Sequence, residues 1–530
     1  MPEKKVTFKT VNNVMYVYYT LRAYRNSAGN PTSDEVSIGK KDTATGMLIP
    51  NQKYFELFHE KKTTTALPQK AASYGTIYCL TEIARTIGLR TILESCFASK
   101  WHQILAVAFY MLCEGNIMMY IDDWFDETEV PFTEKIDDQQ CSRLFASISY
   151  DERMRFFKEW ADLRTEKEYI AYDITSVSTY AKGIDIAEWG YNRDNEMLPQ
   201  VNMGMFYGTT SRLPVYYDLY SGSITDKSHL TFMMTCAQKL GISQVRFVMD
   251  RGFVTEENIS YMKDKGFLFV TAFPGHWGEA KKIIDRCKSS IRKSANRLST
   301  YEVYAVSEDI TLYGFKMRAH IYFEPEKQTL DERELYAHIE RLSKDLEKII
   351  KSGGVTKKYT DFFKVSRGKA DKPRFTLDNE KIDQWLSRTG FFVLLSNDVS
   401  LNSHDILSIY RGKDVIEKNF DQLKNNLDFR RLRTHVNTTT DGKVFVGFLA
   451  LILRSYLLGK IKDNAQTKHL TLDKALRELR KIKSITFEDL SRTLVPVTKL
   501  QRTILEAIGL SQDDLKKSFA DLYTIKTSGI

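Results

Sequence analysis

The sequence predicts an α/β protein of several domains, built around a sheet of mixed strand direction. At 530 residues, the chain is longer than one hydrophobic core supports. Its composition, 42% hydrophobic and 12% aromatic, is that of a globular protein. In the middle of the chain, strand-like and helix-like segments alternate, which is the pattern of an α/β sheet.

Two modules are expected before that sheet. Apolar and polar residues alternate over residues 13–58 around the turn sequence NSAGNP, which predicts a strand-rich module over 1–65. Helical periodicity then predicts a helical domain over 66–165, in the segments 74–89, 101–113 and 151–163. Such helices either pack as a core or dock on DNA, and the sequence leaves both open.

The first part of the sheet domain is expected over residues 166–273. Three hairpin-connected strands are followed by alternating helix and strand, which gives a sheet of mixed direction. The predicted strands are 169–175, 200–208, 213–220, 245–250 and 267–273, with helices over 227–240 and 255–266.

Residues 274–400 are too long for a loop, so we expect a folded module, inserted into the sheet domain. It has strand-like patches and one charged helix over 331–350. The sheet domain should resume over 401–465, and residues 466–530 should form a basic helical tail.

The charge is unevenly distributed. The formal net charge is +9, and residues 401–530 hold 23 lysines and arginines against 15 acidic residues. This surplus favours a polyanion as partner, with a solvated basic tail as the alternative.

Cysteine spacing and hydropathy indicate a protein of the cell interior. The six cysteines have no metal-type spacing, which is typical of reduced thiols in a cytoplasmic protein. The apolar runs beginning at residues 104 and 444 are about half the length of a membrane span, so no membrane association is expected.

The stretch YRGKDVIEKNFDQLK, residues 410–424, places one carboxylate among cations. At about 100° per residue, Tyr410, Lys413, Glu417 and Lys424 fall within roughly 60° of one another on a helix. A surface helix with charge pairing explains this stretch alone. A functional role for Glu417 requires partners elsewhere in the chain.

Two aspartates qualify as partners. Asp173 lies inside the first predicted strand, where a carboxylate is costly unless it is paired or metal-bound. Asp250 ends the fourth strand, and Gly252 permits a sharp turn after it. Each also has a structural explanation: Asp173 in a hydrogen-bond network and Asp250 as the start of a turn. The competing carboxylates, all in turn-like contexts, are Asp185, Asp194, Asp218 and Asp226.

Convergence of Asp173, Asp250 and Glu417 would make an oxygen-rich site for Mg²⁺ or Mn²⁺. A pair of such ions about 4 Å apart activates a nucleophile and stabilises the leaving oxygen of a phosphodiester.

These residues, in this order, resemble the DDE transposases of bacterial insertion sequences, in the group with a Tyr-x2-Arg-x3-Glu-x6-Lys (YREK) signature. The resemblance covers about residues 165–275 and 400–460. It implies an RNase H-like catalytic domain with a β-rich insertion between Asp250 and Glu417. One position departs from the signature, because Lys413 stands where the group has arginine and Arg411 lies on a different face. Lysine keeps the charge but loses the bidentate fork.

The resemblance implies roles for individual residues. Asp173, Asp250 and Glu417 match the catalytic, metal-binding triad, which would hold two Mg²⁺ ions, or Mn²⁺ in their place. DNA contacts are expected from Tyr410, Lys413 and Lys424 of the signature, from Arg411 beside it, and from Trp277, which alternatively packs in the core of the insertion.

The reaction implied is metal-dependent cleavage at the ends of an insertion sequence, followed by 3′-OH strand transfer into target DNA. The expected partners are double-stranded DNA, namely the terminal inverted repeats and the target, and a second copy of the chain in the DNA complex. The expected location is the bacterial cytoplasm, at the nucleoid. Two alternatives remain: a nuclease of the same fold without strand transfer, and a catalytically inactive DNA-binding relative.

Overall fold

The chain forms two compact units in the computed structural model. The model describes residues 6–12, 14–43, 46–58, 67–164, 169–194, 196–224, 226–241, 246–275, 277–349, 357–367, 373–488 and 490–527. One unit comprises Met1–Lys70 with Thr486–Arg492, and the other comprises Ala71–Ile485 with Thr493–Ile530. The domain boundaries expected near residues 65 and 165 lie outside the described residues.

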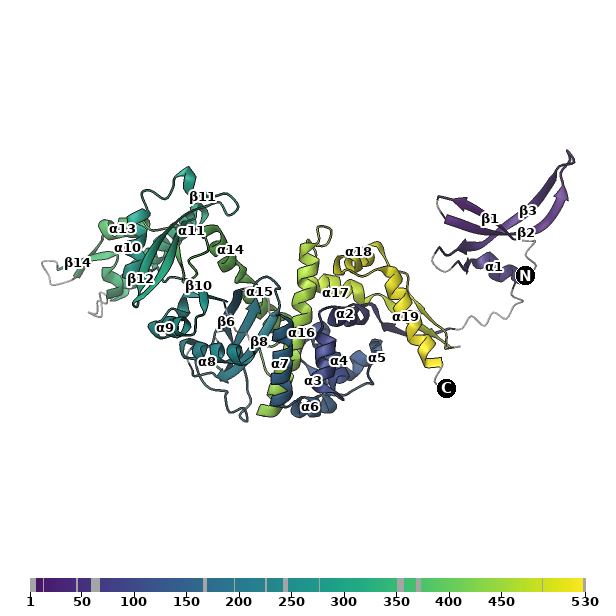
Figure 1. Ribbon diagram of the computed structural model, residues 1–530, viewed down its shortest axis with the longest axis horizontal. Helices are drawn as coiled ribbons and strands as arrows, with labels where there is room; N and C mark the ends of the chain where they lie inside the picture. Colours follow the sequence, from purple (N-terminus) through teal and green to yellow (C-terminus); the bar gives the residue numbers. More distant parts are fainter. Residues whose placement is uncertain are drawn as a thin grey trace. The chain divides into compact units, whose positions relative to one another are not determined.

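The first unit is a four-stranded antiparallel sheet with one helix (Figure 1). The β2–β3 hairpin turns at the predicted NSAGNP sequence, where the Asn26 side chain accepts hydrogen bonds from the Ala28 and Asn30 amides. The Tyr19 ring meets the Phe58 ring edge-on at 4.7 Å, which fixes the helix on the sheet. The elements are β1 (Val6–Val11), β2 (Val14–Arg25), β3 (Pro31–Lys41), β4 (Leu48–Pro50) and α1 (Gln52–Phe58).

Helices from both ends of the second unit pack around one central helix, α16 (Asn437–Asp463), which contacts α2, α4, α6 and α18 (Figure 1). Its mostly apolar sequence buries residues on all sides. The surrounding helices are α2 (Gly75–Thr86), α3 (Leu89–Phe97), α4 (Trp101–Glu114), η2 (Met118–Tyr120), α5 (Ile121–Glu127), α6 (Asp138–Ser147), α7 (Tyr150–Leu163), α17 (Leu472–Arg480), α18 (Lys499–Ile508) and α19 (Gln512–Thr527).

A nine-stranded sheet of mixed direction forms the rest of the second unit, in the order β11-β12-β13-β16-β10-β9-β6-β7-β8. The hairpin-connected strands β6, β7 and β8 are antiparallel, and β9 and β10 run parallel to β6. The sheet is therefore of mixed direction, as the sequence predicts. These elements are β6 (Tyr169–Ser178), β7 (Gln200–Gly208), β8 (Pro214–Ser221), α8 (Asp226–Lys239), β9 (Arg246–Met249), η3 (Arg251–Phe253), α9 (Glu256–Asp264) and β10 (Leu268–Ala272).

The strands of the 274–400 segment extend this same sheet. β16 pairs antiparallel with β10 on one side and with β13 on the other. β11, β12, β13 and β16 therefore belong to the nine-stranded sheet and do not form a sheet of their own. A small second hairpin, β14–β15, and the long helix α11 lie beyond the sheet. The elements are α10 (Gly278–Cys287), η4 (Ser294–Asn296), β11 (Arg297–Leu298), β12 (Val303–Leu312), β13 (Phe315–Phe323), α11 (Pro325–Ile349), α12 (Lys357–Thr360), β14 (Phe363–Arg367), β15 (Pro373–Leu377), α13 (Asn379–Leu386) and β16 (Phe391–Ser396).

After β16 the chain returns across the sheet in three consecutive helical segments, α14 (Ser403–Gly412), α15 (Asp414–Asp421) and the π-helical η5 (Gln422–Asn426). Three short strands, β5 (Pro68–Ser73), β17 (Lys483–Phe487) and β18 (Arg492–Leu494), have residues in both units.

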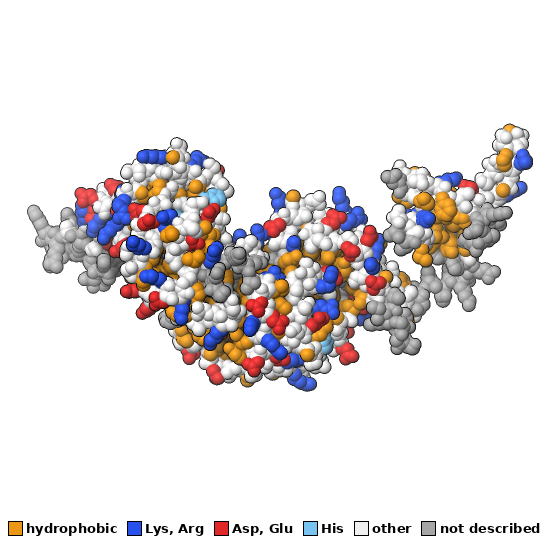
Figure 2. Space-filling view, viewed as in Figure 1, with side chains coloured by type: hydrophobic (Ala, Val, Ile, Leu, Met, Phe, Trp, Pro, Cys, Tyr) orange, Lys and Arg blue, Asp and Glu red, His pale blue; other side chains and the backbone are white. Residues whose placement is uncertain are grey.

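By length and composition, α16 and the bent pair Trp101–Glu114 with Met118–Glu127 are apolar enough to cross a membrane. In α16, 78% of that apolar window is buried inside the protein, as in the central helix of a packed core. On the face shown in Figure 2, basic and acidic side chains are interspersed over the second unit.

Candidate active site

Strand pairing brings the two predicted aspartates side by side. In β6, every residue except Asp173 is buried. β6 and β9 pair in parallel register up to Tyr172 and Met249. Since both chains advance together in a parallel pair, the next residue on each strand is an aspartate, Asp173 on one and Asp250 on the other. Their carboxylates interact electrostatically, since repulsion from the negative charge of Asp250 helps to raise the pKa of Asp173.

Each of these carboxylates is oriented by the amide that follows it. Asp173 Oδ1 accepts a hydrogen bond from the Ile174 amide at 2.8 Å. Asp250 Oδ1 accepts one from the Arg251 amide at 2.8 Å, where the chain leaves β9 and enters η3. One oxygen of each carboxylate is therefore held by the backbone and the other is available for a further partner.

Glu417 comes from the helical return after β16. The sequence predicts that residues 410–424 are helical, and in the structure this stretch covers the end of α14, then α15 from Asp414, then the start of a π-helical segment, with Lys413 between the two α-helices. Lys424 lies in this π-helical segment and forms an ion pair with Asp194. α15 packs on β6, and α14 packs on β9 and β10, so the joint between them lies over the aspartate-bearing strands.

Lys413 occupies that joint. Its side chain is 6% exposed, and its Nζ atom lies 3.1 Å from Glu417 Oε1, whereas the Glu417 side chain is 63% exposed. Burial lowers the pKa of Lys413, but the charges of Asp173 and Asp250 and the hydrogen bond to Glu417 raise it above its ordinary value. A single ammonium group therefore faces all three predicted carboxylates.

Burial dominates the electrostatics of Asp173. It raises the pKa of Asp173 to about 6, against the opposing effect of Lys413 and the Ile174 amide. Burial, with the charge of Asp250, likewise raises the pKa of Tyr410 to about 12. The Tyr410 hydroxyl thus stays protonated and able to donate a hydrogen bond near the carboxylates.

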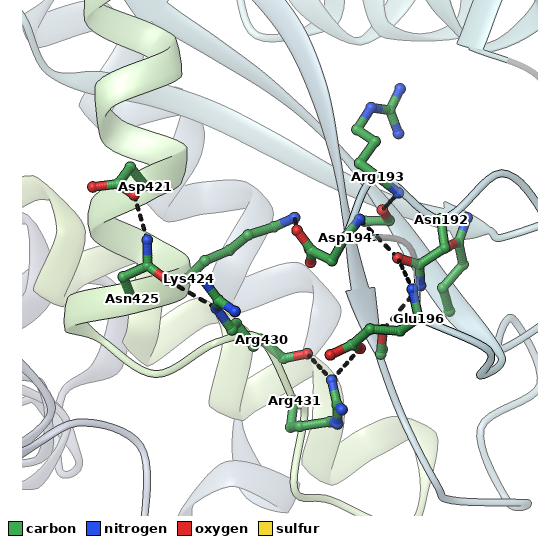
Figure 3. Close-up of polar contacts among 12 residues, drawn as sticks. Asn192, Arg193, Asp194, Glu196, Asp421, Lys424, Asn425, Arg430 and Arg431 are labelled. Atoms are coloured by element: carbon green, nitrogen blue, oxygen red, sulfur yellow. Dashed lines mark hydrogen bonds and ion pairs between the residues drawn. The ribbon is translucent and has the colours of Figure 1, made fainter. Parts of the chain in front are cut away.

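Lys424 belongs to a different cluster (Figure 3). Its Nζ atom lies 2.9 and 2.8 Å from the two carboxylate oxygens of Asp194, in the segment between β6 and β7. The side chains are 10% and 20% exposed. Beside this pair, Arg431 forms an ion pair with Glu196 of the same segment. These contacts anchor the chain after Glu417 to the loop after Asp173.

Sequence reasoning missed the partnership of Asp194 with Lys424. Asp194 was a competing carboxylate, and no local pattern connects two residues 230 positions apart. The Lys413–Glu417 pair was detectable, since an i, i+4 spacing puts both side chains on one helical face.

Two of the residues expected to contact DNA are engaged within the fold. Arg411 donates a hydrogen bond to Glu324 at 3.1 Å and lies over the Tyr301 ring. Trp277 is partly buried against the core, with its ring edge-on to Phe273 at 5.6 Å. The packing alternative given for Trp277 therefore accounts for its position.

Two other competing carboxylates have structural partners away from Asp173. Asp185 accepts a hydrogen bond from the Asn437 side chain at 2.6 Å, and Asp218 faces His229 at 3.3 Å.

The donor set of Asp173, Asp250 and Glu417 suits a hard divalent cation, since all three offer carboxylate oxygens. In the part of the chain that the structure describes, no three acidic, histidine or cysteine side chains lie close enough to hold a metal ion as they stand. The carboxylates instead face a cation of the protein, Lys413, which shows that their arrangement favours positive charge.

One comparison with known proteins identifies a family. The family model described as "Transposase DDE domain" matches residues 164–453, more than half of the chain and a span containing Asp173, Asp250, Lys413 and Glu417. No curated protein matches. A solved structure, the piggyBac transposase synaptic complex with hairpin DNA, is similar at a TM-score of 0.31 and 10% identity, over 78% of this chain and 84% of that one. A likeness this distant supports no conclusion.

Proposed function

Because the chain belongs to the transposase DDE domain family, we propose that it is a DNA transposase whose active site consists of Asp173, Asp250 and Glu417. The observation that carries this assignment is the parallel register of β6 and β9, which ends with the two aspartates on adjacent strands. Glu417 joins them through Lys413 from helices packed over the same strands.

The proposed reaction is hydrolysis at the ends of an insertion sequence, followed by attack of the freed 3′-OH on target DNA. The three carboxylates are proposed to hold two Mg²⁺ ions, or Mn²⁺ in their place, which would activate the nucleophile and stabilise the leaving oxygen. The protein itself orients the carboxylates through the amides of Ile174 and Arg251.

We assign the DNA contacts nearest the reaction to Tyr410 and Lys413. Both lie beside the acids, and Tyr410 keeps its proton over the physiological range. Lys413, Lys424, Arg411 and Trp277 contact DNA in this proposal only if they exchange partners, because Glu417, Asp194, Glu324 and Phe273 respectively engage them in the fold.

The group of transposases and the fold of the catalytic domain are also part of the proposal. The Tyr-x2-Lys-x3-Glu-x6-Lys spacing supports membership of the YREK group of bacterial insertion sequences, with one arginine replaced by Lys413. Three antiparallel strands followed by alternating helices and strands support an RNase H-like catalytic domain. In this proposal the protein acts as a homodimer at the nucleoid. Its partners are the double-stranded terminal repeats of its element and the target DNA.

A joining assay separates this proposal from a nuclease and from an inactive DNA-binding relative. The purified chain is incubated with Mg²⁺, duplexes from both flanks of its own gene and a supercoiled plasmid. A transposase cuts the flank and joins its 3′ end to the plasmid. Cutting without joining supports the nuclease, and retention of DNA without cutting supports the inactive relative.

A further inference from the structure

Lys413 has an unusual position for a residue that contacts DNA phosphates. Its side chain is almost fully buried, and its hydrogen-bonding partner is Glu417 of the triad. It lies at the α14–α15 joint, over the strands that carry Asp173 and Asp250. The ammonium group therefore lies within the protein, on the side of the acids.

The charges around Lys413 are mainly negative. Asp173, Asp250 and Glu417 face it from two strands and its own helix, and Tyr410 lies beside it. Two further cations act on the neighbouring groups: Arg193 lowers the pKa of Asp173, and Arg251 lowers that of Tyr410. Three carboxylates around one ammonium satisfy it electrostatically, whereas without it the carboxylates repel one another.

We propose that Lys413 is a built-in counter-ion that holds the three carboxylates together without metal and weakens their binding of divalent cations. This proposal rests on the function proposed above and adds a control of metal loading. Since Lys413 and a divalent ion neutralise the same carboxylates, the two compete. The signature residue then acts on the metal site before any DNA is bound.

The test is thermal unfolding of the full chain, without DNA, over a range of Mn²⁺ concentrations. Lys413→Met removes the charge and keeps most of the volume. We expect the metal-free variant to melt below the wild type and to reach half of its Mn²⁺-induced stabilisation at about tenfold lower Mn²⁺, since its site no longer holds a competing charge. Lys413→Arg keeps the charge and should need at least as much Mn²⁺ as the wild type.

Lys418→Met is the matched control, because it removes the same charge from an exposed position on the same helix. Lys418→Met should change neither the metal-free melting temperature nor the Mn²⁺ concentration that gives half of the stabilisation. If Lys413→Met lowers the melting temperature equally with and without Mn²⁺, and the Mn²⁺ midpoint does not move, Lys413 is only structural and the inference is overturned. Lys413→Gln is the second variant, with the same expectation, if the methionine variant fails to fold.

Asp173→Asn separates this inference from the proposed function. It should lose most of the Mn²⁺-induced stabilisation. If the Asp173→Asn variant keeps all of the Mn²⁺-induced stabilisation, the metal site lies elsewhere and the proposed function fails too. If Asp173→Asn loses it while Lys413→Met leaves the Mn²⁺ midpoint unchanged, only the role of Lys413 is rejected.

Discussion

Lys413 and Lys424 are both lysines of one sequence motif, and the fold gives them different partners. Lys413 faces the three predicted catalytic acids, whereas Lys424 is buried against Asp194. Both lysines lie in a region of high positive charge, and composition alone gives them the same role of binding a polyanion. Burial and partner distinguish them.

The first prediction concerns Lys424. Lys424→Met leaves the partly buried Asp194 carboxylate without its partner, so we expect a loss of stability on the order of 3 kcal/mol. Urea unfolding measures it. The double variant with Asp194→Asn should recover part of the loss, and Lys418→Met should stay within about 0.5 kcal/mol of wild type. A Lys424→Met variant of wild-type stability would mean that the pair is not formed in solution.

How much of the site is predictable from sequence depends on the range of each interaction. Asp173 and Asp250 stand out because a carboxylate within or at the end of an apolar strand requires an explanation, and Glu417 because its spacing from Lys413 is helical. The ion pair of Lys424 and the contact of Arg411 with Glu324 join distant segments. Only the fold reveals such partners.

At the level of elements, two glycines of helix α16, Gly442 and Gly459, have different surroundings. A side chain at Gly442 would come within 2.0 Å of the Phe145 carbonyl oxygen in α6, so the glycine permits close packing of the two helices. At Gly459 in the same helix, an added methyl group meets nothing within 4 Å.

The second prediction uses this contrast. Gly442→Ala should destabilise the protein by about 1 to 3 kcal/mol, because α6 and α16 must move apart. Gly459→Ala should leave stability unchanged or raise it by up to about 1 kcal/mol, the helix propensity gain. Denaturant unfolding of both variants checks this. Equal effects would show that α6 and α16 do not pack closely at Gly442.

His320 connects β13 to the start of α14. It is fully buried, and its Nδ1 atom lies 2.9 Å from Ser403 Oγ. Burial lowers the pKa of His320 to about 4. Between that value and the ordinary value of about 6.5, the unfolded chain binds a proton that the folded chain does not. The contribution of His320 to stability is therefore complete above about pH 6.5 and is lost as the pH falls towards 4.

The third prediction concerns this loss of stability at low pH. Between pH 7.5 and pH 5, wild-type stability should fall more than that of His320→Gln, by about 2 kcal/mol. Unfolding midpoints at several pH values measure the difference. His404→Gln, at an exposed position of α14, should follow the wild-type pH dependence. Parallel curves for wild type and His320→Gln would contradict the buried neutral histidine.

At the scale of the whole molecule, the sequence predicts the central strands and the mixed direction of their sheet. Strand-like apolar segments and the turns between them are local signals, and the predicted segments 169–175 and 200–208 lie within β6 and β7. The joining of the 274–400 strands to the same sheet is not local. It depends on β16 pairing with β10 across more than 100 residues, which no periodicity encodes.

The fourth prediction concerns the basic C-terminal quarter. Many of its cations are paired within the fold, among them Lys424 and Arg454, so the exposed ones should provide most of the contacts with DNA phosphates outside the active site. The affinity for duplex DNA should therefore fall steeply with salt, with a slope of about −0.9 per phosphate contact on a log–log plot.

Variants locate those contacts. Replacing the exposed Arg477 and Lys483 with alanine should reduce the salt slope by up to roughly 2. The same change at Lys282 and Lys316, exposed in the 274–400 segment, should leave the slope intact. Fluorescence anisotropy over a range of salt measures both. If the affinity of the wild type does not depend on salt, or if only the Lys282 and Lys316 variant reduces the salt slope, the C-terminal quarter does not provide the phosphate contacts.

The central claim is that Asp173, Asp250 and Glu417 together cut DNA, and the most direct measurement is Mg²⁺-dependent cleavage of the DNA flanking the gene. Asp173→Asn, Asp250→Asn and Glu417→Gln should each reduce cleavage to the level seen with EDTA while the folded protein persists. Asp414→Asn, which removes an exposed acid from the helix of Glu417, should cut like the wild type. Wild-type cleavage by any of the three triad variants would contradict the account.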